Sequence, residues 1–295
     1  MTTREVPYPR LHHVQCLHPG GLHRMAYWEW GEADNPDVVV CAHGLTRQGR
    51  DFDRLAGALQ HRFRVVCPDV AGRGRSDWLD PPSLYTFPQY IADMVTLLAQ
   101  LQARRLGWVG TSMGGLIGIG LAGLQGSPLT ALVINDIGPL VAPSGLHRIL
   151  SFVGQRASFA TIEDAAAYLA SVSTGFGRHT KEEWLELTRP MLTQGSTGWR
   201  LHYDPHIIAP MVQATPEAAQ AGEQAWWALY DKIQASTLVL RGAESDILDL
   251  GTAQAMTQRG PKAELIEFPN VGHAPRSGSV DLNRFPREIS GCLVG

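Results

Sequence analysis

The sequence has few cysteines and no long uninterrupted hydrophobic run. Its 295 residues include only four cysteines, and these are not clustered, so we interpret them as reduced side chains rather than as a disulfide framework. No stretch approaches the roughly 18 consecutive apolar residues of a membrane-spanning helix. The N-terminus also lacks the apolar segment of a secretory signal. We therefore expect a cytoplasmic protein that has no membrane partner.

The sequence also has little excess of one charge over the other. Charged residues make up 18% of the chain and the formal net charge is −3, which gives no basic surface for nucleic acid or anionic lipid. Small neutral or weakly charged molecules are the expected partners.

Four histidines lie near the N-terminus: His12, His13, His18 and His23. They lack a recognised metal-binding spacing, and no cysteine pair accompanies them. We interpret them as turn residues and expect no metal.

Short apolar runs alternate with longer amphipathic segments, a pattern that predicts parallel strands joined by helices. Hydrophobic residues make up 44% of the chain, enough for a large core. The predicted strands are 25–30, 38–42, 63–67, 106–110, 131–136, 237–241 and 264–268. Helices are predicted at 51–60, 88–102 and 113–125, and the last helix is expected to begin near Asp281.

The alternation is interrupted between Asp136 and Thr237. The intervening residues are rich in aromatic side chains and contain helix-like stretches at 144–155, 162–171, 181–192 and 216–230. A plain loop of this length is uncommon in a compact domain, so a structured insertion is expected to serve function.

Ser112 lies between Gly110 and Gly114, directly after a predicted strand and before a predicted helix. This is the strand, tight turn and helix context of a nucleophile elbow, in which neighbours without Cβ atoms allow strand and helix to approach closely. Such a motif alone is weak, because serine between glycines is ordinary loop material. The interior glycines of 113–125 also predict close packing of this helix on the sheet.

The rest of the chain supplies partners in the order nucleophile, acid and histidine: Ser112, Asp246 and His273. Upstream, the strand at 38–42 runs into His43, Gly44 and Leu45. With these elements in register, the chain resembles the α/β-hydrolase family. The resemblance implies a mostly parallel eight-stranded sheet flanked by helices, with residues 1–137 and 236–295 as the core domain. It also implies a helical cap at 138–235 over the active site.

Acyl transfer by serine requires a base, a carboxylate that orients the base, and donors aimed at the oxyanion. His273 follows the last predicted strand and is the expected base. Asp246 is the expected acid because it follows the strand at 237–241, where the family's acid usually lies. Its competitors are Glu244, Asp249 and especially Asp136, to which we assign a supporting role.

The backbone N–H groups of Leu45 and Met113 are the expected oxyanion donors, one after the nucleophile and one from the earlier loop. His43 resembles a structural histidine that supports this loop in the family, rather than a second base. The basic loop that contains Arg73 and Arg75 similarly resembles a structural turn near the active site, rather than a phosphate site.

The function expected from these residues is hydrolysis of a small to medium carboxylic ester or lactone through an acyl-enzyme on Ser112, without a cofactor. Serine at the elbow excludes the dehalogenases and epoxide hydrolases, which use aspartate there. Three alternatives stay open: a C–C bond hydrolase of a meta-cleavage-type diketone, a small-molecule receptor, and perhydrolysis as a side reaction. We expect a monomer or homodimer. Aromatic residues of the insertion are the candidates for substrate binding: Trp184, Trp199, Tyr203 and Trp226.

Overall fold

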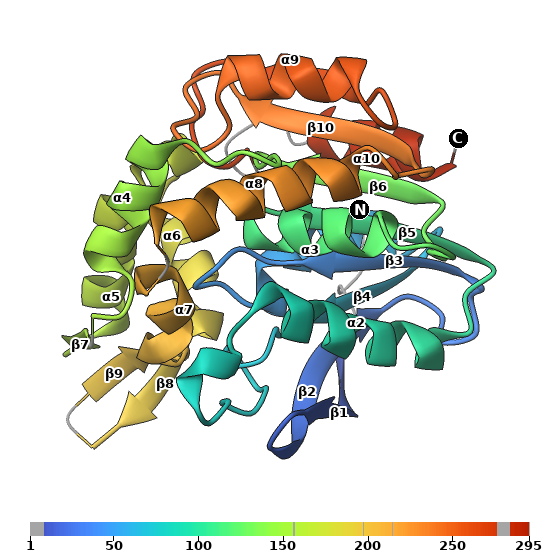
Figure 1. The fold of residues 1–295 in the computed structure, drawn as a ribbon. Helices are drawn as coiled ribbons and strands as arrows, with labels where there is room; N and C mark the ends of the chain where they lie inside the picture. The colour runs from blue at the N-terminus through green and yellow to red at the C-terminus, as the bar shows by residue number, and fades with distance from the viewer. Residues whose placement is uncertain (1–8, 156, 197, 214, 276–283, 295) are drawn as a thin grey trace.

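An eight-stranded sheet forms the centre of the molecule in the computed structural model, which describes residues 9–155, 157–196, 198–213, 215–275 and 284–294 (Figure 1). The strand order is β1-β2-β4-β3-β5-β6-β10-β11. Strands β1 and β2 run antiparallel to their neighbours, and the pairings from β4 to β11 are parallel. The strands are β1 Arg10–His18, β2 Gly21–Trp30, β3 Asp37–Ala42, β4 Arg64–Pro68, β5 Arg105–Thr111, β6 Ala131–Asn135, β10 Ser236–Gly242 and β11 Glu264–Phe268.

Helices cover both faces of this sheet, and each face has its own apolar core. One core joins the sheet to α2 (Phe87–Leu101), α3 (Met113–Ala122), α8 (Pro216–Tyr230) and α9 (Leu250–Gln258). The other joins it to α1 (Asp53–Leu59) and α10 (Arg284–Val294). This arrangement of a mostly parallel sheet between two layers of helices confirms the predicted α/β-hydrolase architecture. The central strands are buried on both faces, which explains why they are continuous apolar runs in the sequence. The predicted start of the last helix near Asp281 lies outside the described residues.

Strand β1 is the element that the sequence prediction missed. Its inward positions, Val14 and Cys16, alternate with exposed ones, which is the period of a strand with one buried face. The interspersed histidines obscured that alternation and led to a prediction of turns. The structure instead places His12, His13 and His18 in β1 and buries His23 in β2, so the prediction of turn residues is wrong. His18 ends β1 and its Nδ1 accepts a 3.0 Å hydrogen bond from the Gly20 N–H of the adjoining turn.

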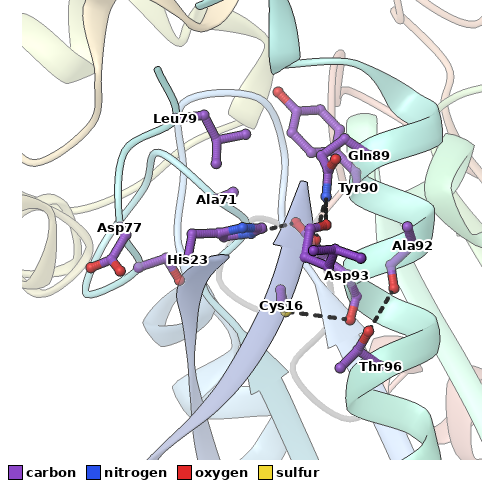
Figure 2. Close-up of polar contacts among 12 residues, drawn as sticks. Cys16, His23, Ala71, Asp77, Leu79, Gln89, Tyr90, Ala92, Asp93 and Thr96 are labelled. Atoms are coloured by element: carbon purple, nitrogen blue, oxygen red, sulfur yellow. Dashed lines mark hydrogen bonds and ion pairs between the residues drawn. The ribbon is translucent and has the colours of Figure 1, made fainter. Parts of the chain in front are cut away.

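Figure 2 shows how the β1–β2 hairpin is fixed to α2. Nε2 of His23 lies 3.1 Å from Oδ2 of Asp93, and Gln89 donates a 2.7 Å hydrogen bond to Oδ1. The Cys16 sulfur is also near, with ligand-type atoms of Cys16, His23 and Asp93 within 4.8 Å of one another. Burial and the neighbouring Asp93 raise the pKa of the Cys16 thiol to about 12, which keeps it protonated. We interpret the cluster as a buried hydrogen-bonded contact between hairpin and helix.

The segment between β6 and α8, which the sequence predicts to be the cap, lies at one end of the sheet, on the left in Figure 1. Its helices largely match the prediction, but it also contains a three-stranded antiparallel sheet in the order β7-β9-β8. The insertion is therefore not purely helical. Its elements are α4 Pro143–Phe152, β7 Ser158–Phe159, α5 Ile162–Val172, α6 Lys181–Thr188, β8 Leu192–Gly195, β9 Gly198–Leu201 and α7 Ala209–Val212. Short 3₁₀ turns occupy Gly49–Phe52, Pro82–Leu84, Thr174–Phe176, Arg189–Met191 and Pro205–Ile208.

Helix α8 lies against the core rather than over the cap. It lies alongside α3 (Figure 1), and the Leu229 backbone is so close to Gly123 that a Cβ on Gly123 would overlap it. The cap segment expected to end at residue 235 therefore includes a helix that packs on the sheet domain.

All four cysteines, Cys16, Cys41, Cys67 and Cys292, are free. Among the described helices, none combines the length and apolar character needed to cross a membrane.

The close approach of α3 to the sheet, predicted from its glycines, is confirmed and leads to a first prediction. A Cβ on Gly114 would overlap the backbone carbonyl of Ala42 in β3, and backbone cannot move as easily as a flexible side chain. We expect Gly114→Ala to lower the free energy of unfolding by about 1–3 kcal/mol, as overpacking does, measured by urea denaturation.

A matched control for this prediction is Gly222→Ala in α8, where nothing lies within 4 Å of the added Cβ. Alanine is the better helix former, so this variant is expected to be as stable as the wild type or more stable, by up to about 1 kcal/mol. Equal losses in the two variants would contradict the packing argument.

Candidate active site

Ser112 occupies the tight turn between β5 and α3, as its motif predicts. Its backbone has φ 53° and ψ −118°. Residues other than glycine rarely adopt a positive φ, so this turn is strained. A Cβ on Gly110 would overlap the carbonyl of Gly114, so the neighbouring glycines are required for this turn. The backbone N–H of Ser112 donates to the Asn135 carbonyl at 2.9 Å, which ties the turn to β6. The hydroxyl is thereby presented at the carboxyl end of the sheet.

His273 lies between Ser112 and Asp136. Its Nε2 is 2.9 Å from the Ser112 Oγ, and its Nδ1 is 2.7 Å from Oδ2 of Asp136. Asp136 is fully buried, follows β6 directly, and has a left-handed φ of 58°. It also accepts hydrogen bonds from the backbone N–H of Gly242 at 2.8 Å and the Ser245 hydroxyl at 2.6 Å. The arrangement is a nucleophile, a base and a carboxylate in hydrogen-bonded series, the geometry that acyl transfer requires.

Asp246 is not the partner of His273, so the sequence prediction for the acid is wrong. Its carboxylate accepts two hydrogen bonds from Arg148 of α4, from Nε at 2.5 Å and from Nη2 at 2.9 Å. The ion pair with Arg148 lowers the pKa of the Asp246 carboxyl. Both aspartates follow parallel strands and so reach the same edge of the sheet, which is why sequence order alone did not separate them. Asp136 takes the position that the prediction gave to Asp246.

The two expected oxyanion donors are the N–H groups of Leu45, which lines the same cavity as Ser112, and of Met113, which follows Ser112 directly. Neither donates to another group within the described ranges. His43 fixes the peptide that carries the Leu45 N–H, because its Nδ1 lies 2.7 Å from the Gly44 carbonyl oxygen. Its Nε2 accepts a 3.0 Å hydrogen bond from the Val70 N–H, so the ring is neutral and Nδ1 carries the proton. Complete burial lowers the pKa of His43 to about 4, consistent with this supporting role and not with a second base.

Arg73 holds the loop that contains Leu45 in place. It is fully buried and donates to the Leu45 carbonyl at 2.8 Å, the Ala71 carbonyl at 2.7 Å and the Tyr90 hydroxyl at 3.0 Å. Arg75 donates its backbone N–H to Asp69 at 2.8 Å. These bonds match the interpretation of this loop as a structural turn, since the Arg73 guanidinium is occupied by oxygens of the protein itself.

A cavity of about 110 Å³ opens beside Ser112 and His273. The floor comes from the loop at His43–Arg47 and the roof from α4, α5 and the turn that follows α5. The roof is mostly apolar, and two arginines line the cavity, Arg47 in the floor and Arg148 in the roof. Residues of the cap that line the cavity are Arg148, Ile149, Phe152, Val153, Leu169, Val172, Ser173 and Phe176.

The four aromatic residues predicted to bind substrate do not line this cavity. Trp226 packs edge-on against Phe87 in the core, and Trp199 pairs with Phe159 in the cap sheet. Tyr203 is buried and lines a separate cavity beside the cap sheet. Trp184 stacks on Phe176 and so supports a lining residue from behind. The prediction chose the largest side chains, whereas the apolar stripe of α4 marks the face that covers Ser112.

The model of the alpha/beta hydrolase family matches residues 39–279. This match includes Ser112, Asp136 and His273 together with most of the sheet and the cap. The chain belongs to the alpha/beta hydrolase family.

Curated relatives of this hydrolase include an oligomer hydrolase and a lipase. A 3-hydroxybutyrate-oligomer hydrolase from Cupriavidus necator is 54% identical over 271 residues, which cover 90% of this chain and 92% of that protein. Lipase LipV from Mycobacterium tuberculosis is 26% identical, covering 77% and 89% of the two chains.

Solved structures agree with the fold of this hydrolase. An alpha/beta hydrolase from Novosphingobium aromaticivorans is 35% identical with a TM-score of 0.83, and the match covers 97% of this chain and 98% of that one. A putative hydrolase from Rickettsia typhi is 27% identical with a TM-score of 0.84, covering 97% and 99%.

The contacts of His273 predict which carboxylate supports turnover. Asp136→Asn keeps the shape of the side chain but removes the charge that orients His273 and stabilises its protonated form. We expect a loss of about 10⁴-fold in kcat on p-nitrophenyl butyrate, measured by release of p-nitrophenol.

The control is Glu244→Gln, which alters a carboxylate of the same loop that carries Asp246 and is expected to turn over like the wild type. Asp246→Asn is expected to cost far less than Asp136→Asn. A larger loss from Asp246→Asn would overturn the placement of the acid at Asp136.

Proposed function

We propose that this protein is a serine hydrolase that cleaves oligomers of 3-hydroxybutyrate through an acyl-enzyme on Ser112. The observation that carries the reaction type is the series of hydrogen bonds from Ser112 through His273 to Asp136 beside the cavity. The substrate class is supported by the 54% identity to the Cupriavidus necator oligomer hydrolase over 92% of that protein's length.

The geometry supports the following sequence of steps. His273 Nε2 removes the Ser112 proton as Oγ attacks the ester carbonyl, and Asp136 stabilises the resulting imidazolium. The N–H groups of Leu45 and Met113 donate to the developing oxyanion. When the tetrahedral intermediate collapses, His273 passes the proton to the departing alkoxide, which leaves as an alcohol. Water then hydrolyses the acyl-enzyme by the same route, releases the acid and restores the Ser112 hydroxyl.

The apolar lining of the cavity also matches the apolar groups of the proposed substrate. An oligomer of 3-hydroxybutyrate presents methyl branches, ester groups and one terminal carboxylate. The apolar side chains of Ile149, Phe152 and Leu169 provide surface for the methyl groups. We further propose that the enzyme uses no cofactor for this reaction and acts on a small molecule as its sole partner, as a monomer or homodimer in the cytoplasm.

The test of this function uses the linear trimer of (R)-3-hydroxybutyrate as substrate. Wild-type enzyme is expected to release monomer and dimer in multiple turnovers, followed by liquid chromatography, and to react covalently with a fluorophosphonate probe. Ser112→Ala removes the nucleophile, so both trimer cleavage and labelling are expected to fall by about 10⁶-fold or below detection.

Other outcomes of this experiment separate the alternatives. Labelling of Ser112→Ala at the wild-type rate would contradict the assignment of the nucleophile. Turnover of a meta-cleavage-type diketone in place of the trimer would favour a C–C bond hydrolase, and a single slow turnover would favour a receptor.

A further inference from the structure

The catalytic cavity contains an arginine that the proposed reaction steps do not use. Arg148 lies on α4 and lines the cavity that also contains Ser112 and His273. Its side chain is 31% exposed, whereas most of the roof around it is apolar. A guanidinium that lines a mostly apolar cavity is costly to bury unless it has a partner, and among the described residues Asp246 is the one hydrogen-bond partner of the Arg148 side chain.

Asp246 holds this guanidinium from behind. The carboxylate is bound by Nε and Nη2 of Arg148, at 2.5 Å and 2.9 Å. This bidentate pairing leaves Nη1 without a hydrogen bond to any group that the structure describes. Because a guanidinium carries five N–H donors in a rigid fork, the N–H groups of Nη1 and the second N–H of Nη2 form an end that remains able to bind a second planar oxyanion.

The backbone around the pair is firmly placed. Gly145, one turn before Arg148, approaches the Asp246 carbonyl so closely that a Cβ would overlap it. The N–H of Ala142 donates to the Ile247 carbonyl at 3.0 Å. Ser245, next to Asp246, donates to Asp136 at 2.6 Å. The loop that holds Arg148 is therefore the same loop that holds the carboxylate partner of His273.

The second arginine of the cavity is less available. Arg47 forms a bidentate pair with Asp51 at 2.5 Å and 2.7 Å, and its Nη2 also lies 3.4 Å from the Leu187 carbonyl. It packs over the Phe176 ring with its guanidinium carbon 5.8 Å from the ring centre. Both members of this pair line the cavity, so their charges offset each other there, whereas Asp246 is not among the lining residues.

We propose that Arg148 binds the terminal carboxylate of the substrate, held in position by Asp246, and thereby selects oligomers that end in a free acid. The proposal rests on the proposed function, because 3-hydroxybutyrate oligomers carry such a carboxylate a short chain away from the terminal ester. Cleavage of that ester leaves the carboxylate on the departing alcohol, so Arg148 acts on the leaving-group side of Ser112. Arg148 is a specificity residue, and Asp246 is its positioning residue.

The test compares two substrates that differ only in this charge: the linear trimer as the free acid and the same trimer as its terminal carboxamide. Wild-type enzyme is expected to prefer the acid by about ten- to hundredfold in kcat/KM, the usual effect of one charge-assisted hydrogen-bonded pair. In Arg148→Met the ratio of acid to carboxamide is expected to fall to about one, mainly through a higher KM for the acid. Arg148→Lys keeps the charge without the fork and is expected to retain part of the preference.

Two further variants make the outcome specific. Arg54→Met removes an arginine that pairs with Glu183 and Glu186 of the cap but does not line the cavity, and it is expected to keep the wild-type ratio. The double variant Arg148→Met with Asp246→Asn removes both charges, so no unpaired carboxylate is left near His273, and it is expected to lose the preference like Arg148→Met.

The possible failures are distinct. An acid-to-carboxamide ratio that is the same in wild type, Arg148→Met and the double variant would overturn the role of Arg148 while leaving oligomer hydrolysis intact. A ratio near one in the wild type would also overturn it. A wild-type enzyme that cleaves p-nitrophenyl butyrate but neither trimer would overturn the proposed substrate class together with this inference.

Discussion

The active site depends on the buried carboxylate of Asp136. It accepts hydrogen bonds from His273, from the Ser245 hydroxyl and from the Gly242 backbone, and so joins three segments that lie far apart in the sequence. A fully buried carboxylate without such donors would be strongly unfavourable. These donors therefore satisfy the carboxylate oxygens at a position where the group orients His273 toward Ser112. Loops after β6, β10 and β11 are fixed relative to one another by this one group.

A second set of contacts fixes the peptide opposite the nucleophile. His43 binds the Gly44 carbonyl and Arg73 binds the Leu45 carbonyl, so the Leu45 N–H points in a direction set by two buried side chains. The strained Ser112 turn is held by the close approach of α3 to β3 and β5. Orientation of donors before the substrate arrives is what makes such groups effective in catalysis. The fold thus places rigid elements on one side of the substrate, and the cap supplies the other.

Much of this could be predicted from the sequence. Continuous apolar runs predicted the central strands within a residue or two, except for β2, which begins earlier, and the glycines around Ser112 predicted both the turn and the close packing of α3. The choice between Asp136 and Asp246 could not be made, because both follow parallel strands and only the side-chain direction separates them. Strand β1 was missed because His12 and His18 take the positions in line with the buried Val14 and Cys16, which leaves a short apolar alternation. The cavity lining was also missed, since Trp184 and Trp226 pack away from Ser112 and only three-dimensional placement reveals this.

The central claim is that Asp136, and not Asp246, is hydrogen-bonded to Nδ1 of His273. Proton NMR of the enzyme labelled with ¹⁵N-histidine tests it directly, because a histidine N–H bound to a buried carboxylate gives a strongly downfield resonance that exchanges slowly with water. The account predicts that this resonance is present in wild type, absent in His273→Gln, lost in Asp136→Asn and retained in Asp246→Asn. Loss in Asp246→Asn together with retention in Asp136→Asn would contradict the account.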